Sequence, residues 1–513
     1  MSAILVDVES RKATPCRRSF VSRGAITVVV LVLQLHPHLA NATTISKVDT
    51  SLSGSEKYTL TVDGKPFYMT SVQIRLDKLR YWWGFDAAAR AAVVAQAARD
   101  GFNTVALPIQ WYEVEPAKDK FDWAILDEYL NLARKNNLKV ELLWFGQNSG
   151  GHVQWLGSPQ NPVHLRTPDY VLYSPGVGSS QTTSEYAIRR DVSPYTLDLA
   201  DDRLRARETY VLGRVMNHIA DWDAASGSAH TVVGVQLDNE VRAFGSFSAF
   251  NPAFPPSMVV SYMSSVGKAV KNSRYVVWTR LNCVNVDTYS RIDANEFQRV
   301  RHGTGIDFVA ADLYNYKAGG VRTFLPFSNG NYRMIAEAPG DIPEAPMIQL
   351  AALSGDAAYI YYEFLGPDRH GIYDRDGAMG FKPRGAYVDT IRTINKLLNS
   401  DMYDVALKSQ GHSLYVHNWT GDLKEESIGV KGISFMPAVT NSQAISIARG
   451  DREVVLMNTL GGTFSLAPGQ HITAATWGYF DANNAWVAKG AVPYSQTAIS
   501  PAPGTTVRLL LSK

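Results

Sequence analysis

The run Val232-Val-Gly-Val-Gln-Leu-Asp-Asn-Glu240 decides how the fold of this 513-residue chain is interpreted. Residues 232–237 are mainly apolar and are typical of a strand that is buried on both faces. The strand ends abruptly in three polar residues, Asp238, Asn239 and Glu240. In α/β barrels the carboxyl ends of the buried strands carry the catalytic side chains. The run therefore predicts a parallel strand with a chemically active end.

Strand-like and helix-like segments alternate from about residue 58 to residue 400. We predict eight strands, over residues 67–74, 103–111, 138–145, 232–237, 275–281, 306–313, 333–336 and 357–362. Predicted helices separate most of them, over residues 85–100, 123–137, 202–221, 258–271, 345–353 and 386–398. This order predicts an α/β fold, a single (β/α)8 TIM barrel. A doubly wound open sheet is the alternative, although no glycine-rich nucleotide-binding loop supports it.

The character of the sequence changes after about residue 400. Short β-like segments at residues 413–417, 444–448, 453–457 and 506–511 are broken by Gly, Asn and Pro, which indicates an all-β sandwich. We therefore assign residues 43–400 to the barrel and residues 401–513 to a C-terminal β-sandwich accessory domain. The β-like segment at residues 58–62 either joins this sandwich or caps the bottom of the barrel. Residues 146–200 form a long insertion after the third strand, and we expect it to wall the barrel mouth.

The N-terminus reads as an export signal. Arg17, Arg18 and Arg23 precede an apolar stretch at residues 25–35, and Ala40-Asn-Ala42 offers a small-x-small cleavage site. The apolar stretch is short for a membrane span, and an uncleaved anchor is the alternative. We therefore expect residues 1–42 to be a signal peptide, the mature protein to be periplasmic or extracellular, and no stable membrane insertion after the leader is removed.

The composition narrows the possible partners. The formal net charge of +2 gives no electrostatic support for a nucleic-acid partner. The histidines after the leader show no metal-ligand spacing, so we expect neither a metal site nor another cofactor. The 11 Trp and 25 Tyr fit the binding of flat sugar faces as well as a large core. Trp144, Trp155 and Trp278 are candidates for either use. The oligomeric state is not indicated.

Several predicted barrel strands end in, or lead to, a carboxylate. These carboxylates are Glu113 and Glu115 after the second strand, Asp238 and Glu240 after the fourth, Asp312 after the sixth, Glu337 after the seventh and Glu363 after the eighth. Two carboxylates on opposite sides of a barrel mouth can flank a glycosidic bond, one as the acid and one as the nucleophile or base. The fourth and seventh strands lie opposite each other. Glu240 and Glu337 are therefore the candidate catalytic pair.

Neighbouring polar residues strengthen this pair. The amide of Asn239 can bind a sugar 2-hydroxyl, a contact that strengthens in the transition state. Tyr314 and Tyr316, past the sixth strand, are placed where a phenol can hold the nucleophilic carboxylate ionised and correctly turned. Core or rim packing is the alternative for both tyrosines. Asp238 and Asp312 are expected to orient their neighbours.

At these residues the sequence resembles a known group of enzymes. Asp238-Asn-Glu240 and a glutamate at the seventh strand resemble the retaining glycoside hydrolases of the (β/α)8 clan. The run Trp111-Tyr-Glu-Val-Glu-Pro116, followed by Phe121-Asp-Trp123 and Leu126-Asp127, resembles the β-galactosidase families 35 and 42. Leu143-Trp-Phe-Gly146, with Gly150-Gly151 and Trp155-Leu156, resembles their strand-three region. The resemblance covers roughly residues 60–400.

The resemblance implies an enzyme that hydrolyses terminal β-linked sugars of an oligosaccharide or polysaccharide by two glutamates and a double displacement. It implies Glu240 as the acid/base, Glu337 as the nucleophile, Asn239 as a 2-hydroxyl contact and Glu115 as a sugar-hydroxyl ligand. The candidate substrate-binding residues are completed by Trp111, Gln147, Asn148, Tyr314 and Tyr316.

Alternatives remain for the roles of two residues and for the sugar specificity. Glu344 is the alternative nucleophile, and a salt bridge is the equal alternative for Glu115. Family 35 members usually show a Glu-Trp pair and a Cys near the third strand, where this chain has Gln147-Asn148. The chain therefore resembles a divergent member of these families. Another sugar specificity, or a carbohydrate-binding protein without catalysis, are the alternatives to a β-galactosidase.

Overall fold

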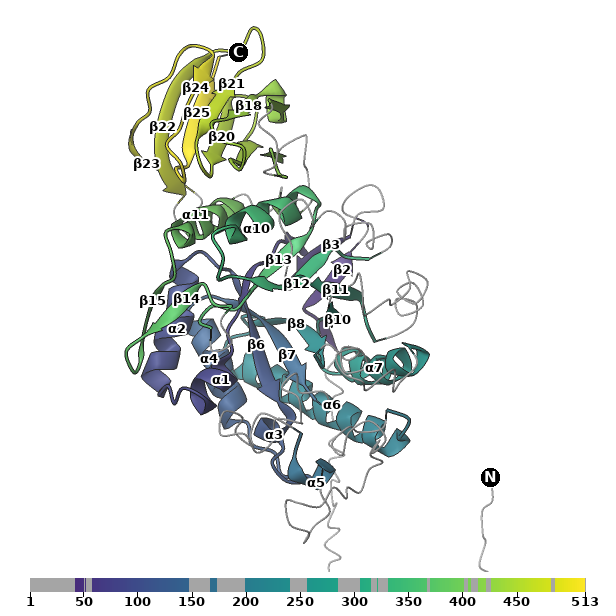
Figure 1. Cartoon of the computed structure of the whole chain (residues 1–513). Helices are drawn as coiled ribbons and strands as arrows, with labels where there is room; N and C mark the ends of the chain where they lie inside the picture. Colours follow the sequence, from purple (N-terminus) through teal and green to yellow (C-terminus); the bar gives the residue numbers. More distant parts are fainter. Residues whose placement is uncertain are drawn as a thin grey trace, which may run out of the picture. The chain divides into compact units, whose positions relative to one another are not determined.

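A computed structural model describes most of the chain (Figure 1). The described residues are 42–49, 51, 58–146, 167–172, 199–239, 256–284, 305–314, 321, 331–366, 370–400, 405–406, 414–420, 426–480 and 485–512. All but the last residue of the expected signal peptide lie outside these ranges, so the leader stays a prediction. Within the described part of the chain, no helix is both long and apolar enough to cross a membrane.

Eight parallel strands close into a barrel, as predicted. In chain order they are β5 (Thr70–Gln73), β6 (Thr104–Gln110), β7 (Lys139–Phe145), β8 (Val232–Leu237), β10 (Trp278–Val284), β11 (Phe308–Asp312), β12 (Met334–Pro339) and β13 (Ala358–Tyr362). Pairing of β13 with β5 completes the ring and excludes the open doubly wound sheet. The fourth and seventh strands are therefore β8 and β12.

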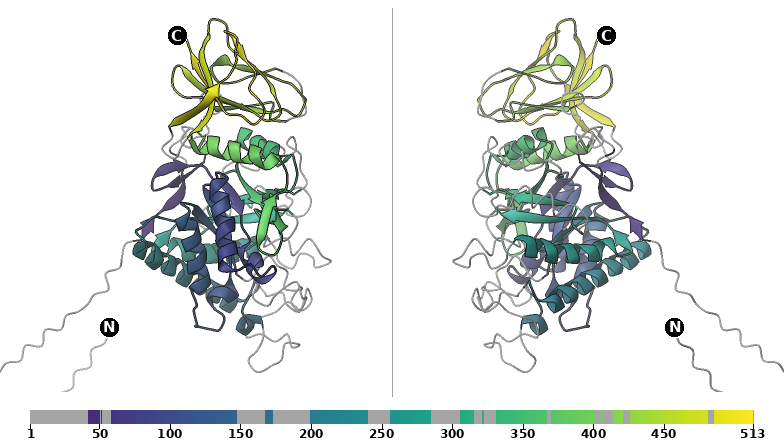
Figure 2. Two further views of the ribbon diagram at one scale, coloured as in Figure 1. Left: turned by 90° about the vertical axis from the view of Figure 1, so that its left-hand side faces the viewer. Right: turned by 90° about the vertical axis from the view of Figure 1, so that its right-hand side faces the viewer.

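Helices lie around the outside of the strands (Figure 2). They are α1 (Leu76–Tyr81), α2 (Ala87–Arg99), α3 (Trp111–Val114), α4 (Ala124–Lys135), α5 (Asp169–Leu172), α6 (Asp202–Ala225), α7 (Pro256–Lys271), α10 (Ala345–Ser354) and α11 (Tyr387–Ser400). The six predicted helices are all present. The amphipathic face of α4 buries Leu126, Tyr129, Leu130 and Ala133, which is the spacing that identified it in the sequence.

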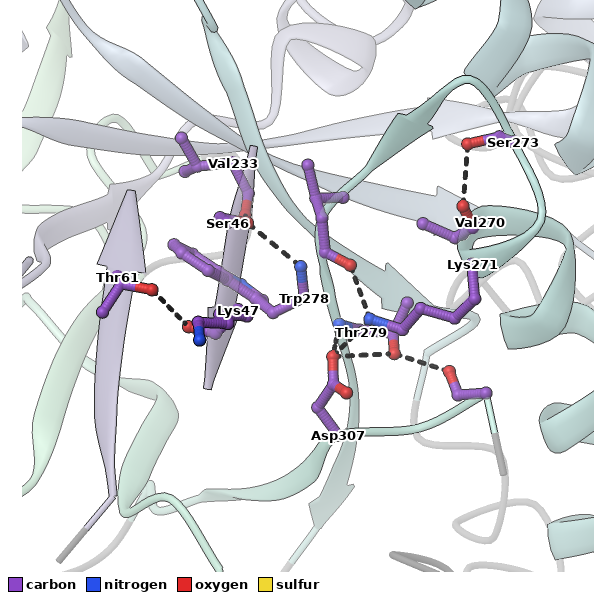
Figure 3. Close-up of polar contacts among 12 residues, drawn as sticks. Ser46, Lys47, Thr61, Val233, Val270, Lys271, Ser273, Trp278, Thr279 and Asp307 are labelled. Atoms are coloured by element: carbon purple, nitrogen blue, oxygen red, sulfur yellow. Dashed lines mark hydrogen bonds and ion pairs between the residues drawn. The ribbon is translucent and has the colours of Figure 1, made fainter. Parts of the chain in front are cut away.

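The N-terminal end of the barrel is closed by a small sheet of β2 (Ser46–Asp49), β3 (Thr59–Val62) and β4 (Lys65–Phe67). Leu60 and Phe67 join the core inside the barrel, beside Val233 and Trp278. Ser46 ties this sheet to two barrel strands, because its Oγ donates to Val233 O and accepts from Trp278 N (Figure 3). The segment at residues 58–62 therefore caps the bottom of the barrel and does not join the sandwich.

A buried ion pair lies inside the barrel between this cap and the opposite end. The guanidinium of Arg280 on β10 donates to both carboxylate oxygens of Glu141 on β7, at 2.9 and 2.6 Å. Trp278 Nε1 donates to the same carboxylate at 3.2 Å. Because both charges are removed from water, loss of either partner would leave an uncompensated buried charge. The pair connects β7 and β10, which lie on either side of β8 in the barrel.

The C-terminal part is a β-sandwich, as predicted. One sheet contains β16 (Leu414–His417), β19 (Ala444–Ala448), β20 (Glu453–Asn458), β25 (Val507–Leu511), β22 (Ile472–Phe480) and β23 (Trp486–Ala491). The other contains β17 (Ser427–Ile428), β18 (Ser434–Pro437), β21 (Gly462–Ser465) and β24 (Ala498–Ile499). Three minor features complete the description: β1 (Thr43–Thr44) with β9 (Tyr275–Val276), β14 (Tyr373–Asp376) with β15 (Gly380–Pro383), and a short 3-10 helix, Val430–Gly432.

Candidate active site

The carboxyl end of β8 positions Asp238 and Asn239. Asp238 has φ of 53°, a left-handed conformation that is uncommon for a residue other than glycine. Its Oδ1 accepts a hydrogen bond from Gly146 N at 2.8 Å, which joins the ends of the third and fourth strands. Asp238 thus orients a neighbouring strand end, as expected. Glu240, the next residue after Asn239, lies outside the described residues, so its role as the acid/base stays a prediction.

Asn239 is buried and held by amide groups from two strands. Its Oδ1 accepts from Gln236 Nε2 at 3.1 Å and from Asn282 Nδ2 at 3.0 Å. Asn282 Nδ2 also donates to Asp312 Oδ2 at 2.9 Å. Asp312 in turn pairs in register with Glu337 on the next strand. Hydrogen-bonded side chains therefore run from Asn239 to Asp312, and Glu337 lies on the adjacent strand in register with Asp312.

Glu337 lies within β12 and is only 5% exposed. The predicted seventh strand stopped at residue 336, whereas β12 continues through Glu337 to Pro339. Tyr314 OH donates a hydrogen bond to Glu337 Oε2, which is the contact that the sequence predicted for this phenol. Glu344 instead precedes α10 and is exposed. Its position excludes it from the strand end and leaves Glu337 as the candidate nucleophile.

Opposing effects act on the ionisation of Glu337. Burial raises the pKa of its carboxyl, and the hydrogen bond from Tyr314 acts in the opposite direction. The positive charges of Arg75, Arg280 and Lys78 also favour the ionised form. The pKa of Glu337 remains above its ordinary value. Glu337 therefore ionises at a higher pH than an ordinary glutamate does.

The end of β5 contributes charged residues that the sequence analysis missed. Arg75 Nε and Nη2 donate to the two oxygens of Asp77, at 2.9 and 2.7 Å, and its guanidinium lies 5.2 Å from the centre of the Phe145 ring. Gln110 Nε2 donates to Asp77 Oδ2 at 3.0 Å. Lys78 Nζ lies 3.5 Å from Tyr362 OH. The run Arg75-Leu-Asp-Lys78 follows the first strand directly, so its position was the available signal.

A second buried carboxyl, Glu363, follows the eighth strand. Burial raises its pKa to about 8, although the charges of Lys78 and Arg75 act in the opposite direction. Glu337 and Glu363 disfavour each other's ionisation. Burial also lowers the pKa of Lys78 to about 7, and the charge of Arg75 acts in the same direction. The pKa values of Glu363 and Lys78 therefore both lie close to neutral pH.

Aromatic rings lie beside the candidate nucleophile. The rings of Tyr314 and Tyr362 meet edge to face at a centroid distance of 5.7 Å, and the His370 ring lies 5.4 Å from Tyr314 and 5.8 Å from Tyr362. Rings of this kind can offer a flat apolar surface and polar edges to a sugar. Tyr316, the other predicted tyrosine, lies outside the described residues, as do Gln147 and Asn148.

Glu115 and Trp111 are engaged in contacts with the protein. Glu115 is fully buried, and its Oε2 accepts from Trp111 Nε1 at 2.9 Å and from Tyr170 OH at 2.5 Å. Its Oε1 accepts from Asp119 N at 2.8 Å and from Arg207 Nη2. These contacts favour the salt-bridge interpretation of Glu115.

Two tryptophans considered as sugar platforms belong to the core. Trp144 and Trp278 are fully buried, and their Nε1 atoms donate to Glu208 and Glu141. Trp155 lies outside the described residues. Over the ranges that the structure covers, no group of three or more His, Cys, Asp or Glu side chains is placed to hold a metal ion.

Comparisons with known proteins give structural likeness only. The sequence matches no protein-family model and no curated protein. A lactosyl-enzyme intermediate of endo-glycoceramidase II from Rhodococcus sp. is similar in structure, with 15% identity over 87% of this chain and 98% of that chain and a TM-score of 0.44. A family 39 glycoside hydrolase from Bacteroides cellulosilyticus is similar with 11% identity, over 89% of this chain and 84% of that one, at a TM-score of 0.48. An exo-β-1,4-mannosidase from an Opitutaceae bacterium shares 15% identity over 67% of this chain and 62% of that chain, at a TM-score of 0.46.

Proposed function

We propose that the protein is an exported retaining β-glycosidase that hydrolyses terminal β-linked sugars, most similar in its motifs to a β-galactosidase. One observation supports this most strongly. A buried glutamate on the seventh barrel strand, Glu337, accepts a hydrogen bond from Tyr314 and is linked along the strand ends to Asn239, the residue before Glu240. A carboxylate, a phenol and an amide in this order suit the transition state of glycoside hydrolysis.

In the proposed reaction Glu337 attacks the anomeric carbon of the sugar. A bond forms between a Glu337 oxygen and this carbon while the glycosidic bond breaks, and Glu240 gives its proton to the departing oxygen. In the second step Glu240 takes a proton from water, and the water oxygen displaces Glu337 from the sugar. The anomeric configuration is retained, which requires the two carboxyl groups to lie about 5–5.5 Å apart.

The surroundings of Glu337 fit both steps. The nucleophile must be ionised to attack, and Tyr314 together with the charges of Arg75 and Lys78 favours that form. After the covalent intermediate forms, the same carboxyl is a leaving group, and the hydrogen bond from Tyr314 stabilises the charge that returns to it. Burial keeps bulk water away from the intermediate.

The proposal also specifies a galactoside as the substrate and export of the protein. A galactoside is favoured by the motifs at residues 111–116, 121–127 and 143–156 alone. The orientation of single hydroxyl groups decides between galactosides, glucosides, mannosides and arabinosides. A panel of aryl β-glycosides tests this directly, and sugar binding without hydrolysis of any of them would favour a carbohydrate-binding protein without catalysis.

The nucleophile is tested by Glu337→Gly. We expect activity to fall by about three orders of magnitude or more, and added azide to restore turnover with a glycosyl azide of inverted configuration as the product. Glu344→Gln is the matched control, because Glu344 is exposed ahead of α10, and it should keep wild-type activity. Failure of azide to restore turnover would show that Glu337 is not the nucleophile.

A further inference from the structure

The amide of Asn239 is part of a chain of side chains whose hydrogen-bond directions determine one another. Gln236 Nε2 donates to Asp238 O at 2.8 Å and to Asn239 Oδ1 at 3.1 Å. Asn282 Nδ2 donates to Asn239 Oδ1 at 3.0 Å and to Asp312 Oδ2 at 2.9 Å. All of these residues are buried. The side-chain NH2 groups of Gln236 and Asn282 therefore each use both hydrogens in bonds to other members of this group of residues.

The direction of these hydrogen bonds is fixed at two acceptors, the carboxylate of Asp312 and the backbone oxygen of Asp238. A carboxylate only accepts hydrogen bonds, whereas an amide has a donor end and an acceptor end that can exchange places by a flip. Asp312 therefore requires the Nδ2 end of Asn282 to face it. The same Nδ2 also meets Asn239, so Asn239 must present its Oδ1 on this side. Its donor end is turned to the other side.

We propose that Asp312 and Asn282 are positioning residues that hold Asn239 as a hydrogen-bond donor to the 2-hydroxyl of the sugar. This inference rests on the proposed function, since it specifies how the same site binds its substrate. It predicts that the site selects sugars with an acceptor oxygen at carbon 2.

The test compares two substrates, the aryl glycoside that the wild type cleaves fastest and its 2-deoxy counterpart. We expect Asp312→Asn and Asn282→Ala each to lower kcat/KM on the 2-hydroxy substrate roughly tenfold and to leave the 2-deoxy substrate within about twofold. Asp312→Asn has almost the same shape as the native residue but lets the amide of Asn282 flip. In an Asn239→Ala background both effects should disappear, because the group that they orient is gone.

Asp307→Asn is the matched control, since Asp307 immediately precedes the same strand, β11, at its other end, where it accepts from Thr279 N. It should change both substrates equally or not at all, and thermal unfolding shows whether each variant is folded. An equal loss on both substrates with Asp312→Asn, or no loss on either, would overturn the inference. A wild-type protein that cleaves no aryl glycoside would instead overturn the proposed function, and the two failures are thus distinct.

Discussion

Lys78 places a positive charge beside the candidate nucleophile although its side chain is only 6% exposed. Burial lowers its pKa to about 7, so below neutral pH it is protonated and favours the ionised form of Glu337. The proposed reaction needs ionised Glu337, and kcat/KM therefore rises with pH through the pKa of Glu337. We expect Lys78→Met to raise that pKa and to move this acidic limb roughly 0.5–1 pH unit higher. The measurement is the pH profile of kcat/KM.

Lys271→Met is the control for the loss of a buried lysine. Lys271 lies on α7, where its Nζ donates to Val277 O at 2.6 Å and pairs with Asp307 (Figure 3). Its loss should lower stability and leave the acidic limb in place. An unchanged limb in Lys78→Met, or an equal shift in both variants, would contradict the proposed effect of the Lys78 charge.

Glu363 makes stability depend on pH. The unfolded chain loses this proton near pH 4, whereas burial raises the folded-state pKa to about 8. Folding stability is therefore lost as the pH rises from the unfolded pKa toward the folded one. Glu363→Gln cannot ionise, and we expect its free energy of unfolding, relative to that of the wild type, to be about 2–4 kcal/mol higher at pH 8 than at pH 4. Urea unfolding at both pH values measures this, and parallel pH dependences would contradict it.

Some residues of the candidate site could be predicted from the sequence and others could not. Glu337 could be found because a carboxylate follows the predicted seventh strand, and Tyr314 because it follows the sixth. Arg75 and Lys78 follow the first strand in the same way, but a search for carboxylates passes over cations. The contacts of Glu115 depend on Arg207 and Tyr170, which are 92 and 55 residues away in the chain. No local pattern reveals partners at such separations.

At the scale of elements, the backbone of α7 packs directly against the backbone of Gly305, which precedes β11. A methyl group added at Gly267 on α7 would collide with the backbone oxygen of Gly305, and one added at Gly305 would collide with the backbone of Lys268. We expect Gly267→Ala to destabilise the protein by about 1–3 kcal/mol, because rigid backbone must move to admit the methyl group. Thermal or urea unfolding provides the measurement.

Gly213→Ala, in the neighbouring helix α6, is the control and should change the stability in the opposite direction. The nearest atom to an added methyl group there is Ala269 Cβ at 4.0 Å, which is an ordinary contact. Alanine also has the higher helix propensity, so this variant should be more stable by up to about 1 kcal/mol. A loss of stability in both variants, or in neither, would contradict the close approach of α7.

The same scale shows what periodicity can and cannot predict. The strands β6 and β7 are mainly apolar runs and α4 has a clear apolar stripe, so these elements were identified correctly. The helices α1 and α3 have only 6 and 4 residues, too few to show a period, and both were missed. In the sandwich, β17 and β24 have 2 residues each and are set by their partners rather than by their own sequence.

At the scale of the whole molecule, α10 and α11 share an apolar core with the larger sandwich sheet. The cluster includes Leu350 and Leu353 of α10, Leu397 of α11, and Ile445 and Ile447 of β19. Gln443 Nε2 also donates to Met347 O at 3.4 Å. The change in sequence character near residue 400 indicated two domains. Direct burial of this kind couples their stabilities, since neither surface stays covered when the other unfolds.

We therefore expect the barrel and the sandwich to unfold together. Phe464→Ala removes a ring from the core between the two sandwich sheets, where such a truncation costs about 3–5 kcal/mol. If unfolding is coupled, the temperature at which activity is lost should fall by roughly 3–5 °C, although no residue of the active site has changed. Ile447→Ala, in the shared core, should act in the same direction and also keep a single calorimetric transition. Two separate transitions, with the activity-loss temperature unmoved by Phe464→Ala, would show that the sandwich folds independently and that the shared core contributes little.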